Sequence, residues 1–150
     1  PIHLVEIIAG KFLACMIVVG LMILLSAYST GYLMLIGQPE TGPVITGYLG
    51  ILLMSGCYVS MGLFASSLTD NQIIAAVISF GLALFMWIIG WGAQASGSGL
   101  GQLLEYLSLI THLEHFLKGL ISSSDLVYYL SFIFFGLFLT HRVLESSRWR

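Results

Sequence analysis

The residues with the clearest potential for chemistry are two histidines in the run His112-Leu113-Glu114-His115. Histidines three positions apart share one face of a helix, and imidazoles beside a carboxylate are typical ligands of zinc or copper. The same run also fits the polar face of a helix that lies at a membrane surface. Because two ligands without a third do not define a metal site, His112 and His115 are weak metal candidates.

Three other features bear on catalysis. The chain contains no GxxxxGK[ST] phosphate-binding loop, so we expect it to be no enzyme and ATP hydrolysis to take place in another subunit. The run Gly97-Ser98-Gly99 places a serine in a flexible loop, without a partner histidine in a neighbouring span. Cys15 and Cys57 lie in apolar runs without CxxC spacing, which indicates buried small hydrophobic residues.

The low content of charged residues predicts that the elements which position these residues are transmembrane helices. Of 150 residues, 58% are hydrophobic and 8% are charged, and the mean hydropathy is +1.00. A soluble domain carries roughly 25% charged residues, and about 20 apolar residues suffice to span the hydrocarbon. We therefore predict a single all-α transmembrane domain over residues 1–150. The net charge of −2 and the lack of a basic patch argue against nucleic acid as a partner.

Four long apolar runs predict four spans, at residues 12–37, 46–68, 72–92 and 126–144, of which the last includes Arg142 near its end, where this side chain reaches the headgroups. A loop rich in proline and glycine separates the first two, and Asp70 or Asn71 caps the third. The second span carries small residues at three- and four-residue spacing, which let helices approach closely in lipid. These are Gly47, Gly50, Ser55, Gly56, Ser60, Gly62 and Ala65.

Residues 102–122 change to an amphipathic pattern before the last span. One predicted face is apolar and contains Leu103, Tyr106, Leu107, Ile110, Leu113, Leu117 and Leu120. The other face is polar and contains Glu105, Ser108, His112 and His115. This pattern predicts an external helix that lies in the membrane interface or packs as a short re-entrant pair. The run Ser122-Ser123-Ser124-Asp125 is interpreted as a break and helix cap.

The positions of the basic residues predict the orientation. Those that flank the first and last spans are Lys11, Arg142, Arg148 and Arg150. The loops after the first and second spans contain no Lys or Arg, and Lys118 is the one basic residue of the 93–125 region. Four spans place both chain ends on one side, so we expect both ends in the cytoplasm.

The first eleven residues form an amphiphilic lead-in to the membrane chain. Ile2, Val5 and Ala9 follow one side of a short predicted helix, and His3, Glu6 and Gly10 lie towards the other. A short helix held at the cytoplasmic surface and joined to a span at Lys11 is suited either to docking a soluble protein or to plain anchoring.

The chain resembles the permease subunits of ABC-2 type transporters, in particular the group that includes gliding-motility and copper-enzyme-maturation permeases. The first stretch that carries the resemblance is Pro1-Ile2-x-x-x-Glu6-Ile7-Ile8-x-Gly10-Lys11-Phe12-Leu13-Ala14. The second comprises Gly47-Tyr48-Leu49-Gly50 and Gly62-Leu63-Phe64-Ala65-Ser66-Ser67-Leu68-Thr69-Asp70-Asn71-Gln72-Ile73-Ile74-Ala75-Ala76. The third is Phe138-Leu139-Thr140-x-Arg142-Val143-Leu144-Glu145-x-x-Arg148-Trp149.

This resemblance implies a six-span permease of which the chain is the C-terminal portion, with residues 1–11 as a cytoplasmic coupling helix. It implies contact of His3, Glu6, Gly10 and Lys11 with an ATPase subunit, and a place for residues 102–122 in an external gate region. Two permease copies would pair, homologous or identical, in the cell inner (plasma) membrane. ATP and magnesium would be bound by the ATPase, and this chain would bind no cofactor.

Taken together, these features predict the permease subunit of an ATP-driven ABC-2 type exporter. No carboxylate, Lys or Arg lies in the middle of a span, where ion-coupled carriers place such groups. We therefore expect the energy for transport to come from another subunit, which supports this function. The alternative is a membrane scaffold or assembly factor that transports nothing and docks a cytoplasmic protein. A third hypothesis is a membrane metalloprotein that uses His112 and His115.

Overall fold

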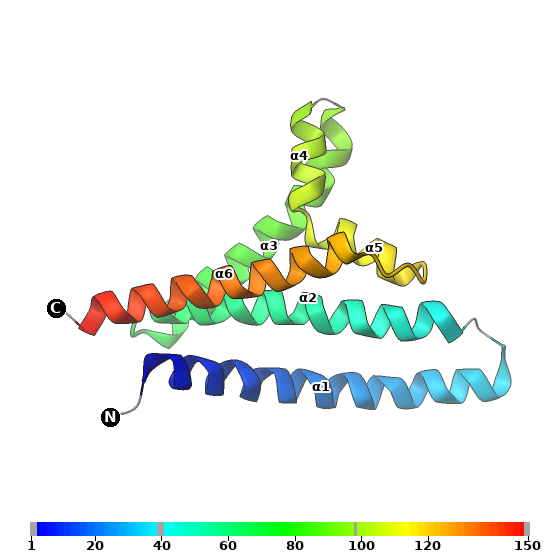
Figure 1. Ribbon diagram of the computed structural model, residues 1–150, viewed down its shortest axis with the longest axis horizontal. Coiled ribbons are helices and arrows are strands. Elements are labelled where there is room, and N and C mark those ends of the chain that lie inside the picture. The colour runs from blue at the N-terminus through cyan, green and yellow to red at the C-terminus, as the bar shows by residue number, and fades with distance from the viewer. Residues whose placement is uncertain (1–2, 39–40, 98, 149–150) are drawn as a thin grey trace.

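The computed structural model describes residues 3–38, 41–97 and 99–148, and nearly all of these are helical. The helices are α1 (Leu4–Ile36), α2 (Thr41–Ser67), α3 (Gln72–Ser96), α4 (Gly99–Leu107), α5 (Leu109–Leu117) and α6 (Ser123–Arg148) (Figure 1). In the described part of the chain, four of them, α1, α2, α3 and α6, are long and apolar enough to cross a membrane. The prediction of an all-α membrane chain with four candidate spans is confirmed.

The first helix differs from the expected order of elements. α1 is one uninterrupted helix of 33 residues, with no break at Gly10 or Lys11. A separate coupling-type helix over residues 1–11, followed by a span over 12–37, is therefore not observed in the described residues. A helical glycine costs only about 1 kcal/mol relative to alanine, and no proline interrupts the apolar run, so the helix continues.

The long helices form a bundle in which α1 and α2 are antiparallel and α6 lies along α2 (Figure 1). The start of α1 and the end of α6 lie at the same end of this bundle. A small pocket of about 70 Å³ joins α1, α2 and α6 there, and its polar lining includes Lys11, Ser66, Ser67 and Thr140. α3 tilts away from the bundle, and its C-terminal part projects as a hairpin with α4 (Figure 1).

The small residues of α2 permit the close packing predicted from their spacing. A Cβ atom on Gly50 would lie 2.7 Å from Cβ of Phe116 in α5. A Cβ on Gly56 would lie 2.9 Å from Cδ1 of Ile133 in α6, and one on Gly136 would lie 2.7 Å from Oγ of Ser60. Small residues on α2 and α6 therefore bring α5 and α6 against α2.

The amphipathic region 102–122 is two helices rather than one. α4 ends at Leu107, and Ser108 caps α5 by accepting a hydrogen bond from the backbone N–H of Thr111 at 3.4 Å. α5 ends at Leu117, and Gly119 then turns the chain with a φ of 85°, a left-handed conformation that favours glycine. The break redirects the chain so that α5 packs along the start of α2.

The predicted faces of this region are only partly observed, since Glu105 and His115 are exposed as expected but two other polar residues are not. His112 and Ser108, assigned to the solvent-facing polar side, are buried, whereas Leu103, Leu107 and Leu117 of the predicted apolar side are exposed. In lipid, exposed apolar side chains cost nothing and polar groups need internal partners. Ser108 and His112 therefore turn inwards, whereas Glu105 and His115 stay exposed.

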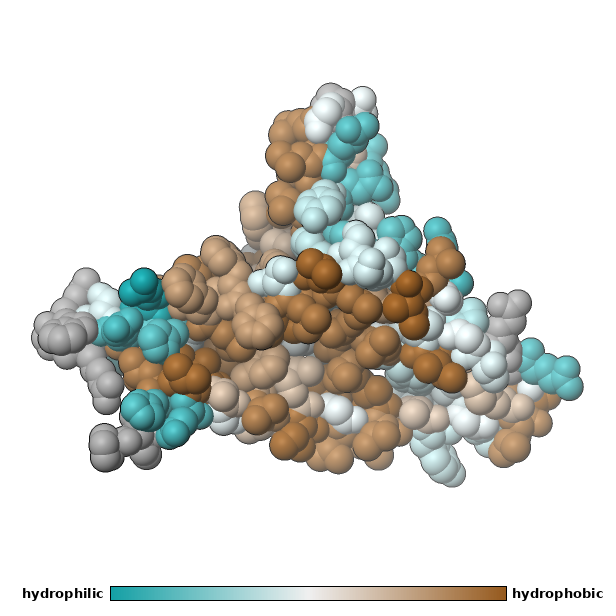
Figure 2. Space-filling model, in the orientation of Figure 1, coloured by the Kyte–Doolittle hydropathy of each residue, from teal (hydrophilic) through white to brown (hydrophobic). Residues whose placement is uncertain are grey.

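The surface of the bundle is mostly apolar. Large apolar side chains cover most of the bundle, and hydrophilic residues gather at its end near the start of α1 and the end of α6 and around α4 and the connections (Figure 2). The buried cluster is small and joins α2, α5 and α6 through Cys57, Leu109, Phe116 and Tyr129. This distribution suits a chain whose long helices contact lipid.

Candidate functional site

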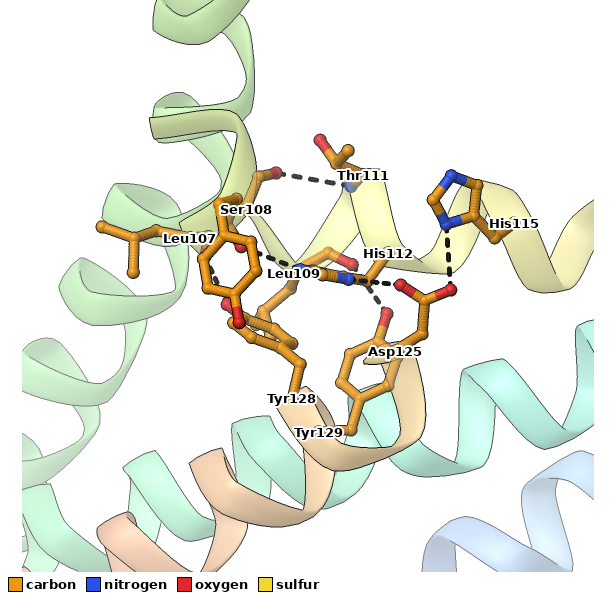
Figure 3. Close-up of polar contacts among 10 residues, drawn as sticks. Leu107, Ser108, Leu109, Thr111, His112, His115, Asp125, Tyr128 and Tyr129 are labelled. Carbon is orange, nitrogen blue, oxygen red and sulfur yellow. Dashed lines mark hydrogen bonds and ion pairs between the residues drawn. The ribbon is translucent and has the colours of Figure 1, made fainter. Parts of the chain in front are cut away.

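A polar cluster lies where α5 meets the first turn of α6 (Figure 3). Asp125, with only 2% of its surface exposed, contacts two histidines through its two carboxylate oxygens. Oδ1 lies 2.5 Å from Nδ1 of His112, and Oδ2 lies 2.9 Å from Nδ1 of His115. The histidine side chains differ in exposure, at 7% for His112 and 47% for His115. One buried carboxylate thus connects a buried histidine to an accessible one.

The second nitrogen of His112 is also occupied. Nε2 donates to the backbone carbonyl of Tyr106 at 2.8 Å, which ties α5 to the last turn of α4. The imidazole ring stacks on the ring of Tyr128, with centroids 3.9 Å apart and planes 18° apart. His112 therefore contacts α4 and α6 at once (Figure 3).

Side-chain hydroxyl groups donate hydrogen bonds to backbone carbonyls around the cluster. Tyr128 donates to the carbonyl of Leu107, and Tyr129 donates to the carbonyl of Leu109 at 2.7 Å (Figure 3). Both carbonyls flank Ser108, where the helix ladder is interrupted. On the other side of α5, Thr46 of α2 donates to the carbonyl of Phe116 at 2.6 Å. Side chains of α6 thus satisfy carbonyls at the break between α4 and α5, and a side chain of α2 bonds the carbonyl of Phe116 near the end of α5.

The polar groups of this cluster bond one another directly. Both oxygens of Asp125 bond the histidines themselves, and Nε2 of His112 is bonded to a carbonyl. Among residues 3–38, 41–97 and 99–148 no group of three or more His, Cys, Asp or Glu side chains is placed to hold a metal. His112 and His115 do come together, but around a carboxylate.

The four residues expected to contact an ATPase lie at the opposite end of the bundle. His3 precedes α1, and Glu6, Gly10 and Lys11 lie on its first turns; all four are exposed. Lys11 lines the small pocket between α1, α2 and α6. Among the residues that the structure describes, no hydrogen bond or ion pair connects this group with the histidine cluster, so the two polar groups are separate.

Asp125 is the residue of the site that the sequence did not identify. Its place after three serines indicated a helix cap, whereas its side chain reaches α5. The available signal was an acidic residue opening an apolar span, ten and thirteen positions after two histidines on one helical face. Such an acid lies in lipid unless it finds partners, and the two histidines are the nearest candidates in sequence.

Comparison with known proteins assigns no family to this chain. No family model, curated protein or solved structure matches this chain. The four candidate spans indicate a membrane protein.

Proposed function

We propose that the chain is the permease subunit of an ATP-driven exporter of the ABC-2 type and that a separate cytoplasmic ATPase docks at the start of α1. The observation that carries this proposal is the exposed polar group His3, Glu6, Gly10 and Lys11. It lies where α1 begins and α6 ends, and exposed Arg142 adds a second charge from α6 at this end.

The uninterrupted α1 supplies a mechanical path from this surface. Its 33 residues extend roughly 50 Å, longer than the roughly 30 Å hydrocarbon core. A displacement of the first turn therefore moves the whole helix, and with it the face that packs on α2. Conformational switching of this kind is a rigid-body shift of packed helices.

The lack of charged residues within the spans also favours a partner subunit as the source of energy. α2 and α3 contain no Asp, Glu, Lys or Arg, and the charges of α1 and α6 lie near their ends. Intramembrane ionisable groups are the usual means of ion coupling. ATP and magnesium would be bound in the partner, and a second permease copy would complete the substrate path.

The test is Glu6→Arg in a complex reconstituted with its ATPase. The charge reversal at the docking surface should abolish most of the transport-linked stimulation of ATP hydrolysis while membrane insertion is retained. Glu114→Arg is the matched control, because Glu114 is also exposed but lies on α5, towards the other end of the bundle. Equal activity of wild type and Glu6→Arg would refute the docking role.

The scaffold alternative gives a different result in purification. A stable native complex that contains another soluble protein and no Walker-type ATPase would establish it and refute the permease. Metal analysis of the same preparation tests the third hypothesis, since zinc or copper at one ion per chain, lost in His115→Gln, would support a metalloprotein.

A further inference from the structure

The hydrogen bonds of His112 require more protons than a neutral imidazole carries. A carbonyl oxygen can only accept, so Nε2, 2.8 Å from the Tyr106 carbonyl, bears a hydrogen. In a neutral imidazole Nδ1 would then present a lone pair. That lone pair would face a carboxylate oxygen at 2.5 Å. An additional proton must therefore lie between His112 and Asp125.

Two contacts place this proton on His112. Asp125 also accepts a hydrogen bond from Nδ1 of His115 at 2.9 Å, so both of its oxygens face ring nitrogens, and a carboxylate is the form that accepts at both. The imidazole ring stacks on Tyr128 at 3.9 Å, and a cation over the face of a tyrosine ring is stabilised by the ring quadrupole. The pair is then imidazolium and carboxylate, and its net charge is zero in a site from which water is excluded.

We propose that the cluster is a proton-binding site that holds His112 as an imidazolium and thereby fastens the α4–α5 connection to α6. The bound proton is what allows His112 to donate to α4 and α6 simultaneously. When it leaves to water, Nδ1 becomes an acceptor facing Asp125, and the two repel. His115 contacts the same carboxylate and is 47% exposed, so it gives the proton a route to the aqueous side.

Apart from His112 and His115, no basic side chain in the described chain forms an ion pair with Asp125. α6 contributes Tyr128 and Tyr129, and α4 contributes Tyr106, whose ring lies 5.6 Å from that of His112. On α5, Glu114 is exposed. α3 carries no titratable side chain, and those of α2 are Tyr48, Cys57 and Tyr58. The proton on His112 is thus the positive charge in direct contact with Oδ1 of the buried carboxylate.

Nitrogen-15 spectra of histidine-labelled full-length protein in lipid nanodiscs test the site. The His112 signals are assigned by their loss in His112→Gln. We expect both ring nitrogens of His112 to be protonated at neutral pH in the wild type. One unprotonated ring nitrogen would overturn the proposal.

Asp125→Asn is the decisive variant. An asparagine amide can accept from His115 through Oδ1 and donate to Nδ1 of His112 through Nδ2, so both hydrogen bonds survive without the extra proton. We expect His112 to become neutral in this variant and to stay an imidazolium in His115→Gln, which keeps the His112–Asp125 contact. An imidazolium in Asp125→Asn would overturn the assignment, and the wild-type spectrum decides on its own if that variant fails to fold.

The fastening role has its own measurement, amide hydrogen exchange corrected for the intrinsic rate at each pH. Residues 109–117 should lose protection by about tenfold or more between neutral and alkaline pH in the wild type, and far less in Asp125→Asn. Equal pH dependence in the two proteins would overturn the role of the proton in fastening α5. This inference does not depend on the permease function, since every readout concerns the chain alone.

Discussion

Asp125 shows how one residue determines the local arrangement of a membrane chain. A carboxylate at the start of an apolar helix is costly unless it finds charge and donors. Its two oxygens find both in His112 and His115, and His112 in turn reaches the carbonyl of Tyr106. In the described chain no buried side-chain nitrogen or oxygen lacks a hydrogen-bond partner. The polar residues of this region thus specify which helices meet.

Gly50 determines the apolar contact between α2 and α5. In Gly50→Ala, the new methyl group would lie 2.7 Å from Cβ of Phe116 and 2.9 Å from Cδ1 of Leu113. We expect overpacking to destabilise the α2–α5 contact by about 1–3 kcal/mol. Thermal unfolding can be followed in a Cys15→Ser background through Cys57, which is fully buried and reacts with a thiol dye only on unfolding.

The control for this experiment is Gly20→Ala in α1. A Cβ there meets nothing within 4 Å, so the higher helix propensity of alanine should raise stability by up to about 1 kcal/mol. The same midpoint for both variants would contradict the close approach at Gly50.

At the level of elements, periodicity was a better guide to the existence of helices than to their environment. Apolar runs predicted α2, α3 and α6 with ends within a few residues, and Asn71 caps α3 as expected, accepting from the N–H of Ile73 at 2.9 Å. The break at Ser108 and the direction of the polar face could not be read from the pattern. Both depend on α6, because Tyr128 and Tyr129 bond the carbonyls around the break and Asp125 attracts the histidines.

The attachment of α5 to α2 can be tested at Thr46. Thr46→Val keeps the side-chain shape and removes the 2.6 Å hydrogen bond to the Phe116 carbonyl, at an expected cost of about 1 kcal/mol. Hydrogen exchange should accelerate in residues 109–117 and remain unchanged in α1. Thr140→Val is the control, because buried Thr140 bonds Gly136 of its own helix at 2.8 Å. Equal effects of the two variants on α5 would show that Thr46 does not attach it.

At the scale of the whole molecule, the distribution of apolar and charged side chains indicates how the chain is oriented in the membrane. The exposed apolar side chains of α1, including Leu25 at 75% and Leu35 at 87%, leave a broad surface for lipid or for other helices. Charge is concentrated beyond this surface, with Lys11 and Arg142 at one end and Lys118 following α5. The excess of basic residues at the first of these ends predicts that it lies in the cytoplasm.

Cysteine accessibility tests the orientation and the bundle together. In a Cys15→Ser background, exposed positions are changed singly by Gln38→Cys, Asp70→Cys, Lys118→Cys and Ser146→Cys. Because α2 and α6 both run antiparallel to α1 (Figure 1), a membrane-impermeant thiol reagent should label positions 38 and 118 in intact cells. Positions 70 and 146 should be labelled only in inverted vesicles. The reverse pattern would preserve the bundle of α1, α2 and α6 and refute a cytoplasmic start of α1, whereas labelling of 70 and 146 from opposite sides would contradict the bundle.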